Sequence, residues 1–241
     1  MRRLIHSMKL DITIQVRNKL YAIGIGIAAI MAGVFSQTLS AEMLPYVVPV
    51  VMLMIIGGTT LMYVAGMILF ERDEGTISAT IVSPLRTGEY IWSKILTLTL
   101  LTTVEATVLI GGTMLILSFS ETVPLPNLPI LISGTLAIGM VFSLVGIILV
   151  VRYDSITDFL IPMAAFVVPL QLPFLHFLGI VEHPLFLLIP TSAQMMMMRA
   201  SFDGLAPLEW LYCVGYTVIT VAALTFWARR AFHTHVVMRA G

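Results

Sequence analysis

The chain has 241 residues, of which 59% are apolar and only 11% are charged. Soluble domains are about 45–50% apolar and about 25% charged, so this surplus exceeds what a water-facing surface can accommodate. The composition excludes a soluble globular enzyme, a nucleic-acid-binding protein and a disordered chain, and it indicates an integral membrane protein with one domain. The single cysteine, Cys213, excludes a disulfide within the chain and a Cys-rich metal site.

Six apolar segments approach or exceed the length of about 20 residues that a helix needs to cross a membrane. We therefore expect an all-α, polytopic fold with spans over Leu20–Leu39, Tyr46–Phe70, Ile95–Phe119, Leu128–Val151, Ile156–Leu172 and Leu208–Trp227. The fifth span is the shortest, and Pro162 and Pro169 predict that it is kinked or broken. A β-barrel is excluded because these segments are continuously apolar rather than alternating.

The basic residues predict the orientation of the six spans. All 13 Lys and Arg except Arg199 fall in segments on the side that holds both termini. Cytoplasmic segments of membrane proteins carry the excess of Lys and Arg. We therefore expect a multi-pass protein of the cell membrane with both termini in the cytoplasm.

The segment 4–19 has a helical pattern of a different kind. Ile5, Met8, Ile12 and Val16 recur at spacings of three and four, with charged residues at other positions. This pattern predicts an amphipathic helix lying along the cytoplasmic surface of the membrane. The alternative is a positively charged flank that only orients the first span.

The segment 173–207 is apolar but is poorly suited to a seventh crossing. The run Leu185–Met198 would rise only about 21 Å as a helix, which is too short, and it contains Pro190. We expect a re-entrant helical hairpin in the outer leaflet, before the last span. Met195–Met198 would give that hairpin an adaptable apolar surface, or would simply fill an irregular gap.

The segment 71–90, between the second and third spans, contains the most organised polar sequence. Four charged residues, Glu71–Glu74, precede Gly75 and Thr76, and about two turns of helix can follow before Pro84. A short helix framed by charge on the cytoplasmic side suits docking to a partner protein. The alternative is a solvated hairpin loop.

Several motifs resemble those of one family, the type-2 permeases of ABC transporters. The residues that carry the resemblance are Glu71, Glu74-Gly75-Thr76, Ser83-Pro84-Leu85 and Lys94. The whole chain follows the family's layout of six spans, an N-terminal interfacial helix and a re-entrant hairpin. Three further motifs look most like those of the permease subunits of fluoroquinolone exporters. They are Arg152-Tyr153-Asp154-Ser155, Asp158-Phe159-Leu160 and Trp227–Phe232.

The resemblance implies an export function powered by another chain. In that family segment 71–90 holds the coupling helix, which docks on the ATPase, with Glu71, Asp73, Glu74, Gly75, Thr76, Ser83, Pro84 and Leu85 as the implied contact residues. The implied partners are two copies of the ABC ATPase, which bind ATP and Mg, and a second permease chain, identical or related. The chain lacks G-x-x-x-x-G-K-[ST] and so binds no nucleotide in that way, and we expect it to bind no cofactor. The implied cargo is a hydrophobic or amphipathic small molecule.

Glu105 lies within the third predicted span, where a carboxylate must be paired, protonated or exposed to water. With Thr99, Thr102 and Thr103 it could line a substrate path, or it could make an interhelical hydrogen bond that fixes packing. A proton-coupled transporter centred on Glu105 is therefore an alternative function.

Asp154 and Asp158 are spaced like the carboxylates that hold magnesium diphosphate in membrane prenyl transferases. This spacing raises the alternative of a membrane enzyme that acts on a lipid or prenyl diphosphate. Ser155 and Asp158 also match a capping box that would start the fifth span, and this interpretation is favoured.

Overall fold

A computed structural model of the chain describes residues 2–76 and 85–238, and within these ranges it contains helices and no strand. The elements are α1 (Arg2–Arg17), α2 (Leu20–Thr38), η1 (Ala41–Met43), α3 (Leu44–Asp73), α5 (Thr87–Leu117), α6 (Leu128–Val150), α7 (Ile156–Gln171), α8 (Pro173–Phe177), η2 (Pro184–Leu188), α9 (Ser192–Asp203), α10 (Pro207–Phe232) and η3 (His233–Val237).

Six helical segments of the described chain are long and apolar enough to cross a membrane, which confirms the predicted number of spans. These segments are Leu20–Thr38, Ala41–Asp73, Thr87–Leu117, Leu128–Val150, Ile156–Phe177 and Pro207–Val236. The third begins well before the predicted Ile95. It does so because the Glu89 carboxylate accepts a hydrogen bond from the Arg86 N–H and caps the longer helix.

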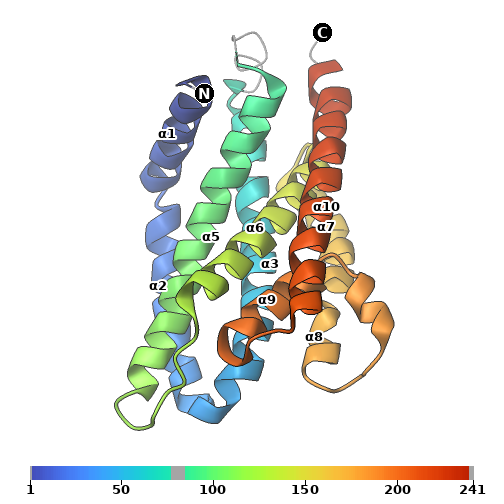
Figure 1. Cartoon of the computed structure of the whole chain (residues 1–241). Coiled ribbons are helices and arrows are strands. Elements are labelled where there is room, and N and C mark those ends of the chain that lie inside the picture. Colours follow the sequence, from blue (N-terminus) through green and yellow to red (C-terminus); the bar gives the residue numbers. More distant parts are fainter. Residues whose placement is uncertain (1, 77–84, 239–241) are drawn as a thin grey trace.

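The long helices run alternately up and down, and both termini lie at the same end of the bundle (Figure 1). We call this the terminal end. The helix α6 lies at the centre, where it packs against α3, α5, α9 and α10. Three helices, α2, α7 and α10, lie on the outside of the bundle. In the apolar stretches of their spans only 17%, 17% and 22% of the residues are buried inside the protein.

The contact between α3 and α6 depends on small residues. A Cβ atom added to Gly57 would lie 2.7 Å from the Phe142 ring, and one added to Gly146 would lie 3.0 Å from Leu61 and from Val64. Small residues let two helices approach closely in a membrane, where no hydrophobic effect drives them together. The bundle centre therefore has no room for an added methyl group at these positions.

The fifth span does not break at either of the two prolines where the sequence predicted a kink or break. The helix α7 continues through Pro162 and Pro169 and ends at Gln171, and a new short helix, α8, begins at Pro173. The break falls at Leu172, because proline is well suited to the first position of a helix and poorly suited to a continuing one.

The segment 173–207 lies at the end of the bundle opposite to the termini (Figure 1). Its main helix, α9, packs against α3, α6 and α10, and Met195 and Met198 are fully buried. These methionines therefore fill the interior of the chain. That this segment enters the membrane and returns as a re-entrant hairpin stays a prediction.

The glycine pair in α3 provides a test of the central packing. A Gly57→Val substitution should lower the free energy of unfolding by about 1–3 kcal/mol, because Phe142 is fully buried and cannot move aside. Gly58→Val is the matched control, because nothing lies within 4 Å of a Cβ at that position. Equal stability of the two variants in SDS-induced unfolding from mixed micelles would contradict this account of the α3–α6 contact.

Candidate functional site: a buried ionic network and an adjacent cavity

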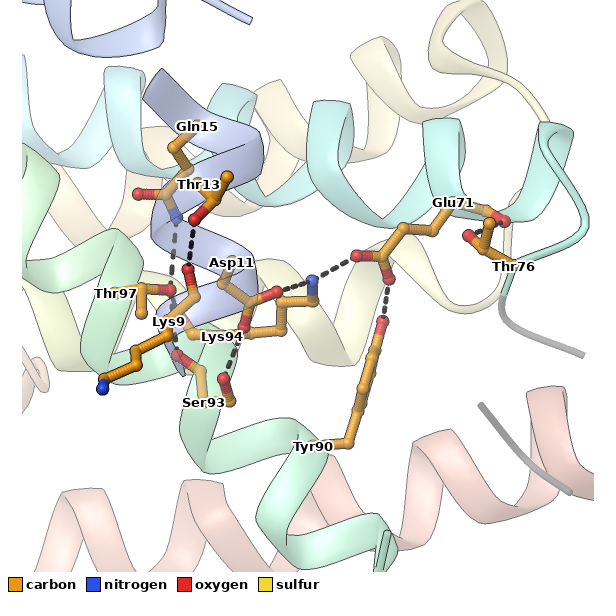
Figure 2. A network of polar contacts seen from close by, with 10 residues as sticks. All are labelled: Lys9, Asp11, Thr13, Gln15, Glu71, Thr76, Tyr90, Ser93, Lys94 and Thr97. Atoms are coloured by element: carbon orange, nitrogen blue, oxygen red, sulfur yellow. Dashed lines mark hydrogen bonds and ion pairs between the residues drawn. The ribbon is translucent and has the colours of Figure 1, made fainter. Parts of the chain in front are cut away.

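A lysine on α5 is buried between two carboxylates from two other helices. The Lys94 ammonium is 2.5 Å from the Asp11 carboxylate of α1, and it also forms an ion pair with Glu71 near the end of α3 (Figure 2). The Lys94 side chain is 1% exposed, and that of Asp11 is 4% exposed. One buried cation therefore joins α1, α3 and α5 at the terminal end.

Neighbouring hydroxyl groups complete the coordination of both carboxylates. The Ser93 hydroxyl donates to Asp11 at 2.5 Å, and the Tyr90 hydroxyl donates to Glu71 at 2.7 Å (Figure 2). A turn further along α1, the Gln15 amide donates to the Thr97 hydroxyl at 3.2 Å. Buried charges are tolerated when they are paired and hydrogen-bonded, and here two carboxylates share one ammonium and two hydroxyl donors.

The helix α1 turns its polar face toward the bundle to make these contacts. Asp11 and Gln15 are buried, whereas Ile5 and Val16 are 50% and 58% exposed. An apolar outer face suits a helix covered by lipid rather than water. The position of α1 at the membrane surface stays a prediction.

Arg72, next to Glu71, makes a second set of contacts on another side of α3. Its guanidinium donates to the Tyr153 carbonyl at 2.6 Å and to the Asp154 carboxylate at 2.7 Å, and it reaches the Val151 carbonyl at 3.4 Å. These acceptors belong to the turn between α6 and α7. Adjacent residues near the end of α3 thus connect that helix to α1 and α5 through Glu71, and to the α6–α7 turn through Arg72.

The predicted docking residues continue from this point. Asp73, Glu74, Gly75 and Thr76 are exposed at the end of α3, and the Thr76 hydroxyl donates to the Glu71 carbonyl at 2.9 Å. Leu85 packs against the core. Ser83, Pro84 and the predicted two-turn helix lie outside the described residues.

Gly75 has a backbone conformation that favours glycine. Its φ angle is 69°, in the left-handed region, and its N–H donates to the Arg72 carbonyl at 3.0 Å. A side chain at this position would be strained by the backbone alone, because nothing lies within 4 Å of an added Cβ. The glycine therefore sets the direction in which the chain leaves α3.

Glu105 and the three threonines do not share one lining. The Glu105 carboxylate accepts a hydrogen bond from the Tyr63 hydroxyl of α3 at 3.3 Å and lies beside Gly24 of α2. Thr99 and Thr102 instead face Gly139 of α6. The Thr103 hydroxyl donates to the Thr99 carbonyl within α5. All four side chains are buried, so the structure connects Glu105 to α2 and α3 and two of the threonines to α6.

Ser155 and Asp158 lie at the start of α7. The Ser155 hydroxyl accepts from the Asp158 N–H at 3.2 Å and donates to the Asp158 carboxylate at 2.7 Å. Asp154 is paired with Arg72. Among residues 2–76 and 85–238, no group of three or more His, Cys, Asp or Glu side chains is placed to hold a metal ion.

A cavity of about 740 Å³ opens beside the ionic network, and we call it the α1–α3 cavity. Its two walls are α1 with the start of α2, and one face of α3. Apolar side chains form most of the lining, among them Leu10, Ile14, Leu20, Met62, Met67 and Phe70. Arg17, Glu71 and Glu74 supply charges, and Tyr63 connects the cavity wall to Glu105.

Sequence reasoning singled out Glu71 and Lys94 but did not pair them, and it missed Asp11, Tyr90, Tyr63 and Arg17. A signal for Asp11 was present, because a carboxylate within an amphipathic membrane helix needs a partner. A signal for Lys94 was also present, because an ammonium group at the start of a membrane span needs a carboxylate partner. The spacing within either helix does not say which partner each one meets.

The six membrane-length helices of the described residues define a multi-pass membrane protein. The model of the fluoroquinolones export permease protein family matches residues 2–240. Two proteins named fluoroquinolones export permease protein, from Mycobacterium tuberculosis strains H37Rv and CDC 1551 / Oshkosh, are each 30% identical to the chain, and the match covers 100% of this chain and 99% of theirs. The chain belongs to this family of export permeases, in agreement with its resemblance to type-2 ABC permeases.

Removing the shared cation should destabilise the protein strongly. A Lys94→Met substitution leaves the buried Asp11 carboxylate and the partly buried Glu71 carboxylate without their cation, which should lower the free energy of unfolding by about 3–5 kcal/mol. Lys9→Met is the control, because the Lys9 ammonium points away from the network in Figure 2. SDS-induced unfolding in mixed micelles measures both. The interpretation fails if the two variants are equally stable.

Proposed function

We propose that the chain is the membrane subunit of an ATP-driven exporter, and that the ATP is hydrolysed by a separate ABC ATPase. Membership of the export permease family supports the transport role. The observation that carries the coupling role is the Glu71–Lys94–Asp11 network, because it joins both flanks of segment 71–90 to α1 inside the bundle.

The proposed transporter contains two permease chains, identical or related, and two ATPase subunits that bind ATP and Mg. Each ATPase subunit grips segment 71–90 of one permease chain. We place this terminal end in the cytoplasm of the cell, because it carries all the basic residues among 2–76 and 85–238 except Arg199 (Figure 1), and cytoplasmic segments carry that excess. The chain itself contributes the transport path and no bound cofactor.

Closure of the ATPase pair would push on segment 71–90 and thereby on the end of α3 and the start of α5. Glu71 and Lys94 would pass this displacement to α1 through Asp11. Arg72 would pass it to the α6–α7 turn. Movement of packed helices as units can switch a path between inward- and outward-facing states.

The cargo we propose is a hydrophobic or amphipathic small molecule, moved outward. The relatives named above are fluoroquinolones export permeases, and a drug of that chemical class is the first candidate for this chain.

Two other functions have less support. A prenyl diphosphate enzyme would need Asp154 and Asp158 for magnesium, but Asp154 is paired with Arg72 and Asp158 is hydrogen-bonded to Ser155. An ion-coupled transporter would need Glu105 to exchange protons along a path, and its carboxylate is held by Tyr63. Drug transport driven by a proton gradient without ATP would favour the second of these.

The turn at Gly75 tests the coupling. Gly75→Pro should abolish ATP-dependent drug transport and the stimulation of the ATPase, because a proline cannot adopt φ 69° and lacks the N–H that bonds to Arg72. Gly179→Pro is a matched control at the opposite end, since Gly179 has φ 70° and donates its N–H to His176 at 3.1 Å. Glu74→Lys should act like Gly75→Pro by reversing a docking charge.

The measurement uses inside-out vesicles from the host cell that contain the chain and its ATPase. Uptake of norfloxacin, a fluoroquinolone, is followed with ATP and with a non-hydrolysable analogue, and membrane insertion is checked for every variant. If Gly75→Pro transports as well as Gly179→Pro, segment 71–90 is not the coupling element. If uptake does not depend on ATP, the proposed function is wrong.

A further inference from the structure

We propose that the α1–α3 cavity binds an amphipathic zwitterion, an aromatic molecule that carries one carboxylate and one basic amine, before it is exported. This inference rests on the proposed function, because it names the chemical class of the exported molecule and the place where the chain first holds it. It adds a binding site made by α1, the start of α2 and α3.

The cavity has the size and lining of a small-molecule site. Its volume of about 740 Å³ falls within the range of about 300–1,000 Å³ that is typical of ligand pockets. Phe70 and Met62 line it and are 53% and 41% exposed. Large apolar side chains that stay exposed inside a concavity favour a flat, apolar body as the occupant.

Two opposite charges line the same cavity in the permease chain on its own, without its ATPase. Arg17 lies in the last turn of α1, and Glu74 lies just beyond α3. Both are exposed, and within the part of the chain that the structure describes neither forms an ion pair. Glu71, the other charged lining residue, is already held by Lys94 and Tyr90. A molecule with both charges can satisfy Arg17 with its carboxylate and Glu74 with its ammonium group.

The cavity is also connected, through Tyr63, to a carboxylate buried inside the bundle. Tyr63 lines it and donates a hydrogen bond to Glu105, which lies 3% exposed among α2, α3 and α5. An occupant in contact with the Tyr63 ring is therefore one hydrogen bond away from the buried carboxylate. The side chain of Glu71 belongs both to this lining and to the Lys94 network, so the site adjoins the residues that we propose transmit the action of the ATPase.

Charge-matched ligands test the site without ATP. The purified full chain is placed in nanodiscs of phosphatidylglycerol, and binding of three ligands is measured by fluorescence: norfloxacin, its ethyl ester, which lacks the carboxylate, and its N-acetyl derivative, which lacks the basic amine. Empty nanodiscs give the background.

Each charged residue should recognise one group of the ligand. Arg17→Gln should weaken norfloxacin about tenfold, the loss of one charge-assisted hydrogen bond, and leave the ester unchanged. Glu74→Gln should weaken norfloxacin to the same extent and leave the N-acetyl derivative unchanged. Arg230→Gln and Glu42→Gln, on exposed residues outside the cavity, should change none of the three affinities.

A filled cavity gives an independent measurement. Gly66 lines the cavity, and a Cβ added there would meet only the Phe70 ring, at 3.7 Å, so Gly66→Leu can fold normally and occupy the space. This variant should weaken norfloxacin at least tenfold, as the loss of apolar contact area predicts. Gly215→Leu on α10 is the matched control, because nothing lies within 4 Å of an added Cβ there.

The outcomes separate this inference from the proposed function. Norfloxacin binding that is unchanged in Arg17→Gln, Glu74→Gln and Gly66→Leu overturns the inference, while ATP-dependent transport by the wild-type chain would still uphold the exporter. Equal weakening of norfloxacin and its ester by Arg17→Gln also overturns it. Loss of binding in phosphatidylethanolamine nanodiscs would assign the cavity to a zwitterionic lipid headgroup instead.

Discussion

A single buried ammonium group, that of Lys94, holds the terminal end of this permease together. It lies between Asp11 of α1 and Glu71 of α3 and pairs with both carboxylates, whose side chains are only 4% and 15% exposed. This pairing fixes the register of three helices at once, because each must bring one side chain to the same point. Tyr90 and Ser93, from the same turn of α5 as Lys94, supply the remaining donors.

The consequence is that the ends of segment 71–90 are attached to the bundle by charge rather than by apolar packing alone. Glu71 and Arg72 are adjacent and reach different neighbours, so a displacement of the end of α3 acts on α1 and α5 through one residue and on the α6–α7 turn through the other. The close contact of Gly57 with Phe142 gives α3 little freedom to move apart from α6. Together these contacts favour movement of the helices as units.

Much of the fold could be predicted from the sequence. Apolar length predicted the six spans, but the break expected at Pro162 or Pro169 falls instead at Leu172, before Pro173. The start of the third span was placed too late, at Ile95, because the polar residues of Thr87–Lys94 were interpreted as lying outside the membrane-length helix. They belong to α5 because their polar groups are satisfied by Asp11, Glu71 and a capping contact at Glu89.

The candidate site was predictable only in part. Glu105 was identified as a carboxylate within a span that is paired, protonated or exposed to water, but its partner Tyr63 comes from a helix distant in the sequence, and two of the threonines grouped with it face α6.

The sequence by itself determined that this is a helical membrane protein, how often it crosses, and which residues would be costly to bury. Those properties depend on composition and local length, which the chain carries residue by residue. Only the tertiary structure decided how the costs are met: which carboxylates share Lys94, which acceptors take Arg72, and which face of α1 lies inward. The same holds for the α1–α3 cavity, because a concave surface with Arg17 and Glu74 on its walls exists only once α1, α2 and α3 are placed against one another.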